Sequence, residues 1–249
     1  MTAPKASTRA MAPNPTAGDG GSAHAAATVP VVAVDGPAAS GKGTIAEGVA
    51  AVLRFHRLDS GALYRLVAWR ALESATPLDD APALAALARL DARFDADRVT
   101  AGGHDVTAAL RGEDVSAAAS RVAVHPAVRA ALTERQRAFR RPPGLVADGR
   151  DMGTVIFPDA RLKVFVTASP AERAARRHKQ LIAKGISVTL ESLLREIEAR
   201  DARDAGRSAA PLAAAPDAVT LDTTGVAPGA SIAAVLELCR ARGIEPARE

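Results

Sequence analysis

Five short strand-like stretches recur along the chain, and segments with helical spacing of their apolar residues lie between them. Short apolar runs without strict alternation are typical of strands buried on both faces of a parallel sheet. Strands that alternate with helices predict an α/β fold, here a three-layer α/β/α arrangement with an open parallel sheet of about five strands. The expected strands cover residues 31–34, 55–59, 145–147, 162–166 and 218–221.

Spacing and capping signals predict the helices. Ser60 can cap a helix that runs towards Leu72, and Ser169 opens a Ser-Pro-Ala-Glu segment that matches a capping box with proline at the first helical position. Further helices are expected at residues 77–90, 122–139, 170–178, 189–204 and 231–242. The first helix should bury one face, formed at i, i+4, i+7 and i+8 by Ile45, Val49, Val52 and Leu53.

The pattern changes in the middle and at the beginning of the chain. Residues 93–97, 99–103 and 105–109 resemble short strands with a Gly-Gly turn, so an inserted subdomain is expected within residues 76–144, and the core at 29–75 and 145–249. Residues 1–28 are rich in Ala, Thr, Pro and Gly, which predicts a disordered tail. A targeting peptide is the alternative, but this stretch has neither an apolar segment nor a convincing amphipathic helix.

Composition and charge narrow the possible partners. The chain has 32 Lys and Arg against 28 Asp and Glu, a net charge of +4, which suits nucleotides and nucleic acids alike. One Trp and one Tyr leave little for stacking single-stranded bases. The single cysteine, Cys239, excludes an intramolecular disulfide and is expected to be buried. No apolar run approaches the roughly 20 residues of a membrane helix. A soluble, cytoplasmic protein without bound nucleic acid or membrane is expected.

The first strand leads into a glycine-rich segment that can bind phosphate. Its glycines let backbone N–H groups turn towards phosphate oxygens, Lys42 reaches the outer phosphates, and the Thr44 hydroxyl can serve Mg2+. The threonine stands one position later than in the standard Walker pattern, and this Lys-Gly-Thr form is similar to that of nucleoside monophosphate kinases. The segment consists of Gly36, Pro37, Ala38, Ala39, Ser40, Gly41, Lys42, Gly43 and Thr44.

Charged residues cluster where a ligand would sit. Asp35, Asp59 and Asp148 each fall at a strand end, and ligands of open parallel sheets bind at the carboxyl ends of strands. Asp35 either contacts Mg2+ through water or simply ends its strand. Phosphoryl transfer also needs positive charge around the migrating group. Three arginines share one face of the late helix if it extends that far, although a solvated face with ion pairs is the alternative: Arg200, Arg203 and Arg207.

Five separate motifs, the phosphate-binding segment included, together resemble the bacterial cytidylate kinase family. They occur in the family's order, and the resemblance runs from about residue 31 to the C-terminus. The other four are Asp-Ser-Gly-Ala-Leu-Tyr-Arg at 59–65, Ala-Phe-Arg at 138–140, Ala-Asp-Gly-Arg-Asp-Met-Gly-Thr at 147–154 with Phe-Pro-Asp at 157–159, and Arg-Asp-Ala-Arg-Asp at 200–204 with Arg207 and Ala-Pro-Leu at 210–212.

The resemblance implies a kinase that phosphorylates CMP or dCMP with ATP and Mg2+. It implies a monomer with a nucleotide-monophosphate-binding insertion and a mobile helical lid at about residues 170–210. The catalytic residues would be Lys42, Arg150, Arg200 and Arg207. The acceptor phosphate would be held by Ser60, Arg65, Arg150 and Arg207, with Tyr64 nearby; the ribose by Arg200 and Asp204; and the cytosine ring by Ser120, Arg129 and Asp151.

Several of these assignments keep a simpler alternative. A carboxylate at Asp151 would accept from the exocyclic amine of cytosine and would face the O4 carbonyl of uracil, but this aspartate can also cap a turn. Ser60 can be only a helix cap. The lid-region arginines Arg173, Arg176 and Arg177 can contact the donor or form surface pairs. The lone histidines His125 and His178 are treated as structural or exposed, and no Cys/His set suggests zinc.

Other functions remain to be separated from this one. A UMP kinase, an AMP kinase or a P-loop kinase with a non-nucleotide acceptor would share the phosphate-binding segment. A guanine-reading switch protein normally needs an Asn-Lys-x-Asp loop, but Asn14 in the tail is the only asparagine. A nucleic-acid-binding role would rest on basic charge alone.

Overall fold

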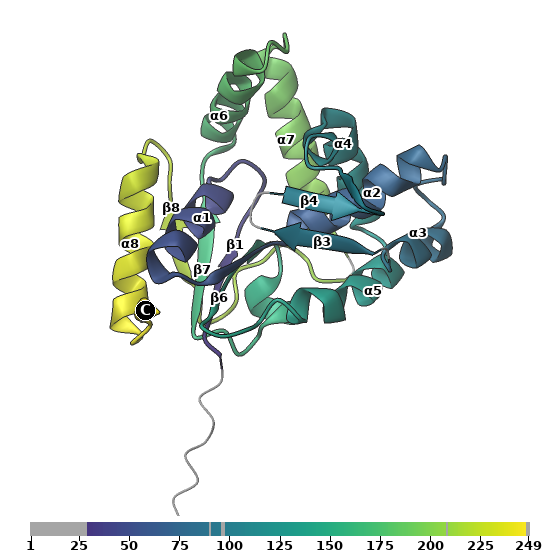
Figure 1. Ribbon diagram of the computed structural model, residues 1–249. Helices are drawn as coiled ribbons and strands as arrows, with labels where there is room; N and C mark the ends of the chain where they lie inside the picture. The colour runs from purple at the N-terminus through teal and green to yellow at the C-terminus, as the bar shows by residue number, and fades with distance from the viewer. Residues whose placement is uncertain (1–28, 90, 96–97, 208, 248–249) are drawn as a thin grey trace, which may run out of the picture.

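A five-stranded parallel sheet forms the centre of the molecule (Figure 1). The computed structural model of the chain describes residues 29–247 apart from 90, 96, 97 and 208, so the predicted tail lies outside the described residues. The strand order is β2-β6-β1-β7-β8, and every neighbouring pair is parallel, which confirms the predicted sheet. The strands are β1 (Val31–Asp35), β2 (His56–Asp59), β6 (Leu145–Gly149), β7 (Leu162–Thr167) and β8 (Val219–Asp222).

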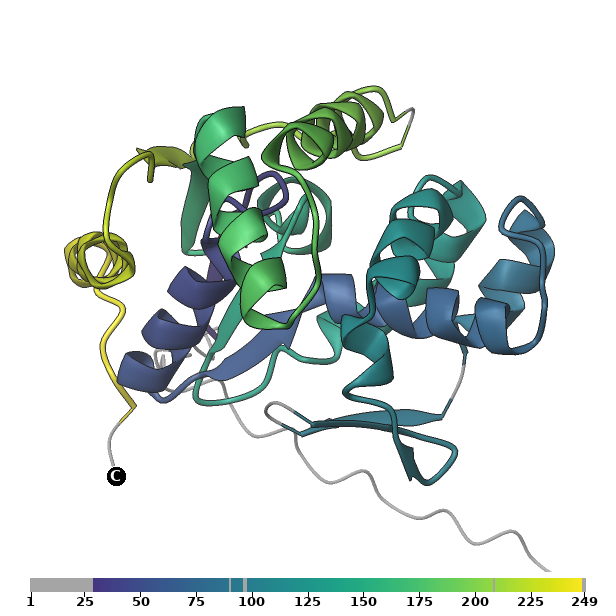
Figure 2. The ribbon, with the colours of Figure 1, turned by 90° about the horizontal axis from the view of Figure 1, so that it is seen from above.

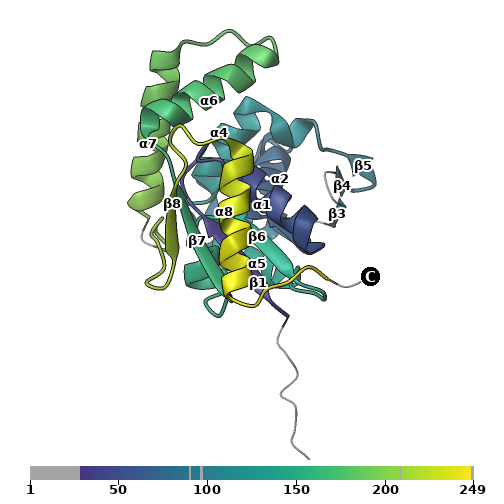
Figure 3. The ribbon, with the colours of Figure 1, turned by 90° about the vertical axis from the view of Figure 1, so that its left-hand side faces the viewer.

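Helices cover both faces of this sheet because alternate side chains of each strand point to opposite sides. Val32 and Val34 pack with α1 (Lys42–Leu53) and α8 (Pro228–Ala241), which lie in front of the sheet in Figure 3. On the other face, Val31 and Ala33 pack in a second core cluster. The helices of that side are α2 (Ser60–Glu73), α4 (Glu113–Val122) and α5 (Pro126–Arg137).

Two of the three short strands predicted for the insertion exist but are shorter than expected. α3 (Ala81–Leu87) precedes β3 (Ala92–Asp95), β4 (Arg98–Ala101) and β5 (His104–Asp105), which form a separate three-stranded sheet at one side of the molecule (Figure 2). The strand expected at 105–109 is wrong. Only two residues pair, since the Asp105 carboxylate accepts from the Thr107 backbone N–H and turns the chain into a 3-10 helix at Ala109–Arg111.

Two long helices, α6 (Pro170–Ala183) and α7 (Leu190–Ala205), form a hairpin that projects from the top of the molecule in Figure 1. The Ser169 hydroxyl accepts from the Glu172 N–H, as its capping role requires. The reciprocal half of the predicted capping box is absent, because the Ser169 N–H donates to Thr224 and the Glu172 carboxylate accepts from Arg176.

Two local predictions about helices are wrong. Asp59, not Ser60, is the N-cap of α2: its Oδ1 accepts from the Ala62 N–H at 3.1 Å, and Ser60 is the first helical residue. Val52 is 48% exposed, because α8 covers only part of α1 and the buried stripe is narrower than the apolar pattern. The predicted burial of Cys239 is confirmed.

Contacts of Arg140 at the other end of the sheet explain the Ala-Phe-Arg segment at 138–140 and the Phe-Pro-Asp segment at 157–159. Arg140 donates to the Val29 carbonyl at 2.8 Å and forms an ion pair with Asp159 at 2.7 Å. It therefore ties the segment that enters β1 to the segments around α5 and β7. Among the described residues, no helix is both long and apolar enough to cross a membrane.

Candidate active site

A cavity of about 900 Å³ opens at the carboxyl ends of the strands, between the glycine-rich loop, the α6–α7 hairpin, α2 and α4. It is lined by most of the predicted site residues. The exceptions are Gly36 and Pro37, which lie behind the loop, and Asp204, which is 1% exposed and contacts the cavity through the arginines it holds.

Backbone geometry determines the glycine-rich loop. Gly36 has φ +152°, and a Cβ at this position would lie 2.1 Å from the Val166 carbonyl oxygen, so only glycine fits beside β7. Gly41 (φ 90°) and Ala39 (φ 57°) also adopt left-handed conformations. These turns aim the loop and the N-terminus of α1 at the cavity, where unpaired N–H groups can donate hydrogen bonds to anion oxygens.

Lys42 is the first residue of α1, and its Nζ donates to the Pro37 carbonyl at 3.2 Å. Burial, and next the positive charge of Arg150, lower the pKa of Lys42 to about 7. A phosphate anion nearby would favour the charged ammonium. The lysine is therefore poised to become fully charged when a phosphate enters.

Carboxylate and hydroxyl oxygens at the loop fit a Mg2+ ion in part. Thr44 is exposed in the first turn of α1 and lines the cavity. The buried Asp148 Oδ2 has no hydrogen-bond partner, and its pKa is raised chiefly by burial. Asp35 does not fit, because its two oxygens accept the N–H groups of Met152 and Gly153. These bonds hold an unpredicted π-helical turn, Met152–Ile156, and Asp35 serves the backbone there.

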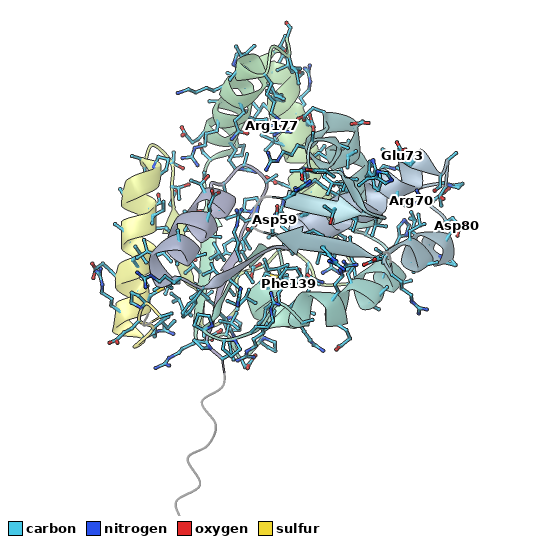
Figure 4. The ribbon with its side chains drawn as sticks, in the orientation of Figure 1. Asp59, Arg70, Glu73, Asp80, Phe139 and Arg177 are labelled. Atoms are coloured by element: carbon cyan, nitrogen blue, oxygen red, sulfur yellow. The ribbon has the colours of Figure 1, made fainter. Side chains whose placement is uncertain are left out.

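Asp59 and Asp148 are direct neighbours across β2 and β6, and each faces an arginine. The Asp59 Oδ2 pairs with Arg65 at 2.6 Å, which lowers the pKa of Asp59 despite its burial. The Asp148 Oδ2 lies 3.7 Å from Arg57. Asp59 and Arg177, both labelled in Figure 4, line the cavity, which therefore extends from the strand ends to the α6–α7 hairpin.

A buried carboxylate holds two of the predicted phosphate-binding arginines. Asp204 accepts from Arg150 at 2.9 Å through one oxygen and from Arg207 through the other. Arg200 stands nearby with an unpartnered Nε, and burial lowers its pKa to about 10. The side chain of Arg207 is 5% exposed. All three arginines line the cavity, and two of them share the Asp204 carboxylate as their counter-charge.

A second buried pair lies deeper in the cavity. Arg129 of α5 forms an ion pair with Asp151, and its guanidinium carbon lies 5.7 Å from the centroid of the Tyr64 ring. Both charged residues are buried, so each neutralises the other in a poorly solvated place. The Ser120 hydroxyl is also buried and has no partner. This end of the cavity presents donors and acceptors suited to a flat polar ring.

The remaining candidates are not brought into the cavity or have structural contacts. Arg203 is exposed on the other side of α7. Arg173 is buried and pairs with Asp201 at 2.5 Å. Arg176 lines the cavity but donates to the Ser40 and Thr223 carbonyls at 3.2 and 2.5 Å. The His125 ring contacts the Leu78 carbonyl at 2.8 Å.

Sequence reasoning missed two residues at this site, Arg57 and Thr223, which line the cavity. Arg177, for which a donor contact or a surface pair was expected, lines the cavity and pairs with Glu113 of α4. Arg57 stands at a strand position that alternates with buried Leu58, which is a signal that strand periodicity offers. Thr223 has no such signal, because its buried contacts with Ser40 and Thr167 form only in the folded chain.

The parallel sheet, the glycine-rich loop and the lysine at the start of α1 define a P-loop protein, and the cavity with its many arginines defines one of the nucleotide kinase class. The family model described as cytidylate kinase matches residues 32–241. The chain belongs to this cytidylate kinase family.

Curated relatives agree with this assignment. The chain is 56% identical over 217 residues to a cytidylate kinase of Bordetella bronchiseptica, which covers 87% of this chain and 97% of the relative. It is 58% identical over 210 residues to that of Cupriavidus necator, covering 84% and 95% of the two chains. It is 54% identical over 211 residues to that of Chromobacterium violaceum, again covering 84% and 95%.

Proposed function

We propose that this chain transfers the terminal phosphoryl group of ATP to CMP or dCMP. The observation that carries the proposal is that one cavity contains both a phosphate-binding loop and, facing it, a cluster of arginines backed by a buried pair suited to a base. A cavity of about 900 Å³ with two such ends fits two nucleotides joined at the migrating phosphate. Family membership supports the same reaction.

At the donor end, residues 36–44 surround the ATP phosphates with backbone N–H groups, and Lys42 neutralises the outer phosphates. Mg2+ would be held by Thr44 and, on the geometry described above, by Asp148, and it would shield the charge of the phosphates. Lys42 gains full charge as the phosphates arrive, so positive charge is greatest when the negative charge of the transition state develops.

At the acceptor end, Ser60, Arg65, Arg150 and Arg207 hold the phosphate of CMP, with Arg200 and Asp204 beside the ribose. Asp204 keeps Arg150 and Arg207 in place before substrate binds, which reduces the reorganisation that binding requires. Ser120, Arg129 and Asp151 recognise the cytosine ring. Tyr64 supports Arg129, whose guanidinium lies over the face of the tyrosine ring. The acceptor oxygen is already anionic near neutral pH, so no general base is needed.

The domain boundaries follow from this assignment. The insertion at 76–144 would form the monophosphate-binding part, and residues 170–210 the lid that excludes water and averts ATP hydrolysis. The ion pair between Arg177 and Glu113 joins these two parts. We further propose that the protein acts as a monomer in the cytoplasm.

Steady-state rates with CMP, dCMP, UMP and AMP at fixed ATP and Mg2+ test the proposal. CMP or dCMP is expected to have the highest kcat/KM. If UMP or AMP is the best acceptor, the chain is a different nucleoside monophosphate kinase. Slow ATP hydrolysis without acceptor, stimulated by none of the four, would reject the nucleotide kinase function altogether.

A further inference from the structure

A fully buried glutamine lies behind the acceptor end of the cavity. Gln136 occupies the inner face of α5, two turns after Val128 and one turn after Leu132, where an apolar side chain would continue the core stripe. It is 0% exposed, and neither its Oε1 nor its Nε2 has a hydrogen-bond partner. An unpaired buried amide costs stability. Packing alone therefore does not account for a polar residue here.

The neighbours of Gln136 connect it to the site. Arg129 lies two turns earlier on the same face of α5, and its guanidinium carbon lies 5.7 Å from the centroid of the Tyr64 ring. Burial raises the pKa of Tyr64 to about 12, and an interaction of the phenol with the Gln136 amide opposes that rise. The phenol stays protonated, and because the interaction opposes the rise in pKa, it is the Gln136 Nε2–H that can donate to the phenol oxygen. In this geometry the two side chains interact without completing a hydrogen bond of normal distance and angle.

We infer that Gln136 is a positioning residue: its Nε2–H donates a hydrogen bond to the Tyr64 phenol oxygen when an acceptor nucleotide fills the cavity, which fixes the ring beneath Arg129. Arg129 is in turn held against Asp151, the proposed cytosine reader. The inference rests on the proposed function for the identity of the acceptor. It adds an indirect support, out of reach of the nucleotide, to the residues that line the cavity.

Two variants remove the two halves of this hydrogen bond. Gln136→Met keeps the length of the side chain and removes the amide, while Tyr64→Phe removes only the phenol oxygen. Each is expected to raise the KM for CMP about 3- to 10-fold, the effect of one lost hydrogen bond, with the KM for ATP and the kcat changed less than about twofold. The double variant should be no worse than either single variant, because both remove one interaction.

A matched control tests packing. Leu132→Met changes a buried side chain one turn away on the same face of α5 without touching a polar group. It should leave the KM for CMP at the wild-type value. The midpoint of thermal unfolding should stay the same or rise in Gln136→Met, since an unpaired buried amide has been removed, and this separates positioning from loss of structure.

The chain contains a single tyrosine, which gives a direct readout of the phenol. In protein labelled with 13C-tyrosine, CMP should shift the Cζ resonance of the wild type, and Gln136→Met should lose most of that shift although CMP still binds at saturating concentration. A wild type that prefers another acceptor would contradict the proposed function alone. The same measurements are then made with that acceptor.

Three results would overturn the inference. The first is an unchanged acceptor KM in Gln136→Met. The second is an additive loss in the double variant, which would mean that the two residues act separately. The third is a parallel rise in both KM values with a lower unfolding midpoint, shared by Leu132→Met, which would assign Gln136 to packing.

Discussion

The two ends of the cavity are built in different ways. The loop end uses the main chain of nine consecutive residues, and its shape depends on Gly36, where a Cβ does not fit, and on the left-handed conformation of Gly41. The opposite end uses side chains from α2, α4, α5 and α7 and from the segments that follow β6 and α7, and four of its arginines are already paired with a buried or half-buried acid. The loop end therefore depends on backbone conformation, whereas the arginine end depends on charge balance.

The largest effect is expected where backbone conformation leaves no alternative. Gly36→Ala forces a Cβ to within 2.1 Å of the Val166 carbonyl, so the loop must leave its place beside β7. We expect a loss of about 4 kcal/mol in the free energy of unfolding together with loss of ATP binding. Gly43→Ala is the matched control, since its Cβ would meet only the Arg57 guanidinium at 3.8 Å. Equal unfolding midpoints of the two variants in urea would contradict this account.

At the arginine end, removal of one charge should act on turnover. Arg150→Ala is expected to lower kcat with CMP by about 10²- to 10³-fold and to change the KM for ATP little, because we propose that its guanidinium binds the acceptor phosphate. Arg140→Ala is the control: its ion pair with Asp159 lies at the other end of the sheet, and kcat should be kept. A larger effect of Arg150→Ala on ATP affinity than on turnover would assign this arginine to the donor.

The buried pair should govern the choice of base. Asp151→Asn retains the shape of the side chain that Arg129 needs and replaces an acceptor by an amide. We expect the preference for CMP over UMP, as a ratio of kcat/KM values, to fall by about 1–3 kcal/mol. The ratio cancels any loss of folded protein, because both substrates are measured on one preparation. An unchanged ratio would remove Asp151 from base recognition.

At the loop end, Lys42 should gain its positive charge when phosphate binds, so the affinity for ATP should depend on pH. The pKa of Lys42 is about 7 before phosphate is present, and bound phosphate raises it. Between about pH 7 and 9 ATP binding must then take up a proton, so Kd should increase by up to about tenfold per pH unit. Calorimetry in buffers of different ionisation enthalpy measures both quantities. Lys42→Met should show no such dependence, and a flat wild-type profile would contradict the assignment.

The smallest effect is expected for the ion pair between Arg177 of α6 and Glu113 of α4. Glu113 and Arg177 are partly exposed, so Glu113→Gln should cost only about 0.2–1 kcal/mol and raise either KM less than about fivefold. The effect should disappear in high salt. Arg195→Ala, which breaks the exposed pair with Glu191 in the same hairpin, is the control. A tenfold change in kcat would give this pair a larger role than its exposure suggests.

The same difference explains what sequence could predict. The loop, the five strands and most helices depend on local patterns, and these predictions are confirmed to within a few residues. The cap of α2 was wrong because Asp59 and Ser60 are both good caps, and the backbone conformation at residue 59 decided between them. Which arginine meets which acid depends on segments far apart in the chain. Arg203 and Arg207 looked equivalent by spacing, but the helix ends at Ala205 and only Arg207 turns inward.

Arg173 connects the α6–α7 hairpin to the rest of the site. Its guanidinium donates to the Ala168 and Ala38 carbonyls and to Asp201, so one side chain joins β7, the glycine-rich loop and α7 at the base of the hairpin. From Arg173 to the end of α6 at Ala183 the helix spans about 15 Å. A rotation of about 10° at Arg173 would move the end of the helix by about 3 Å, given that length. Because Arg173 also donates to the Ala38 carbonyl, a small displacement of the loop backbone would reach the hairpin through this side chain and would be larger at the end of the hairpin.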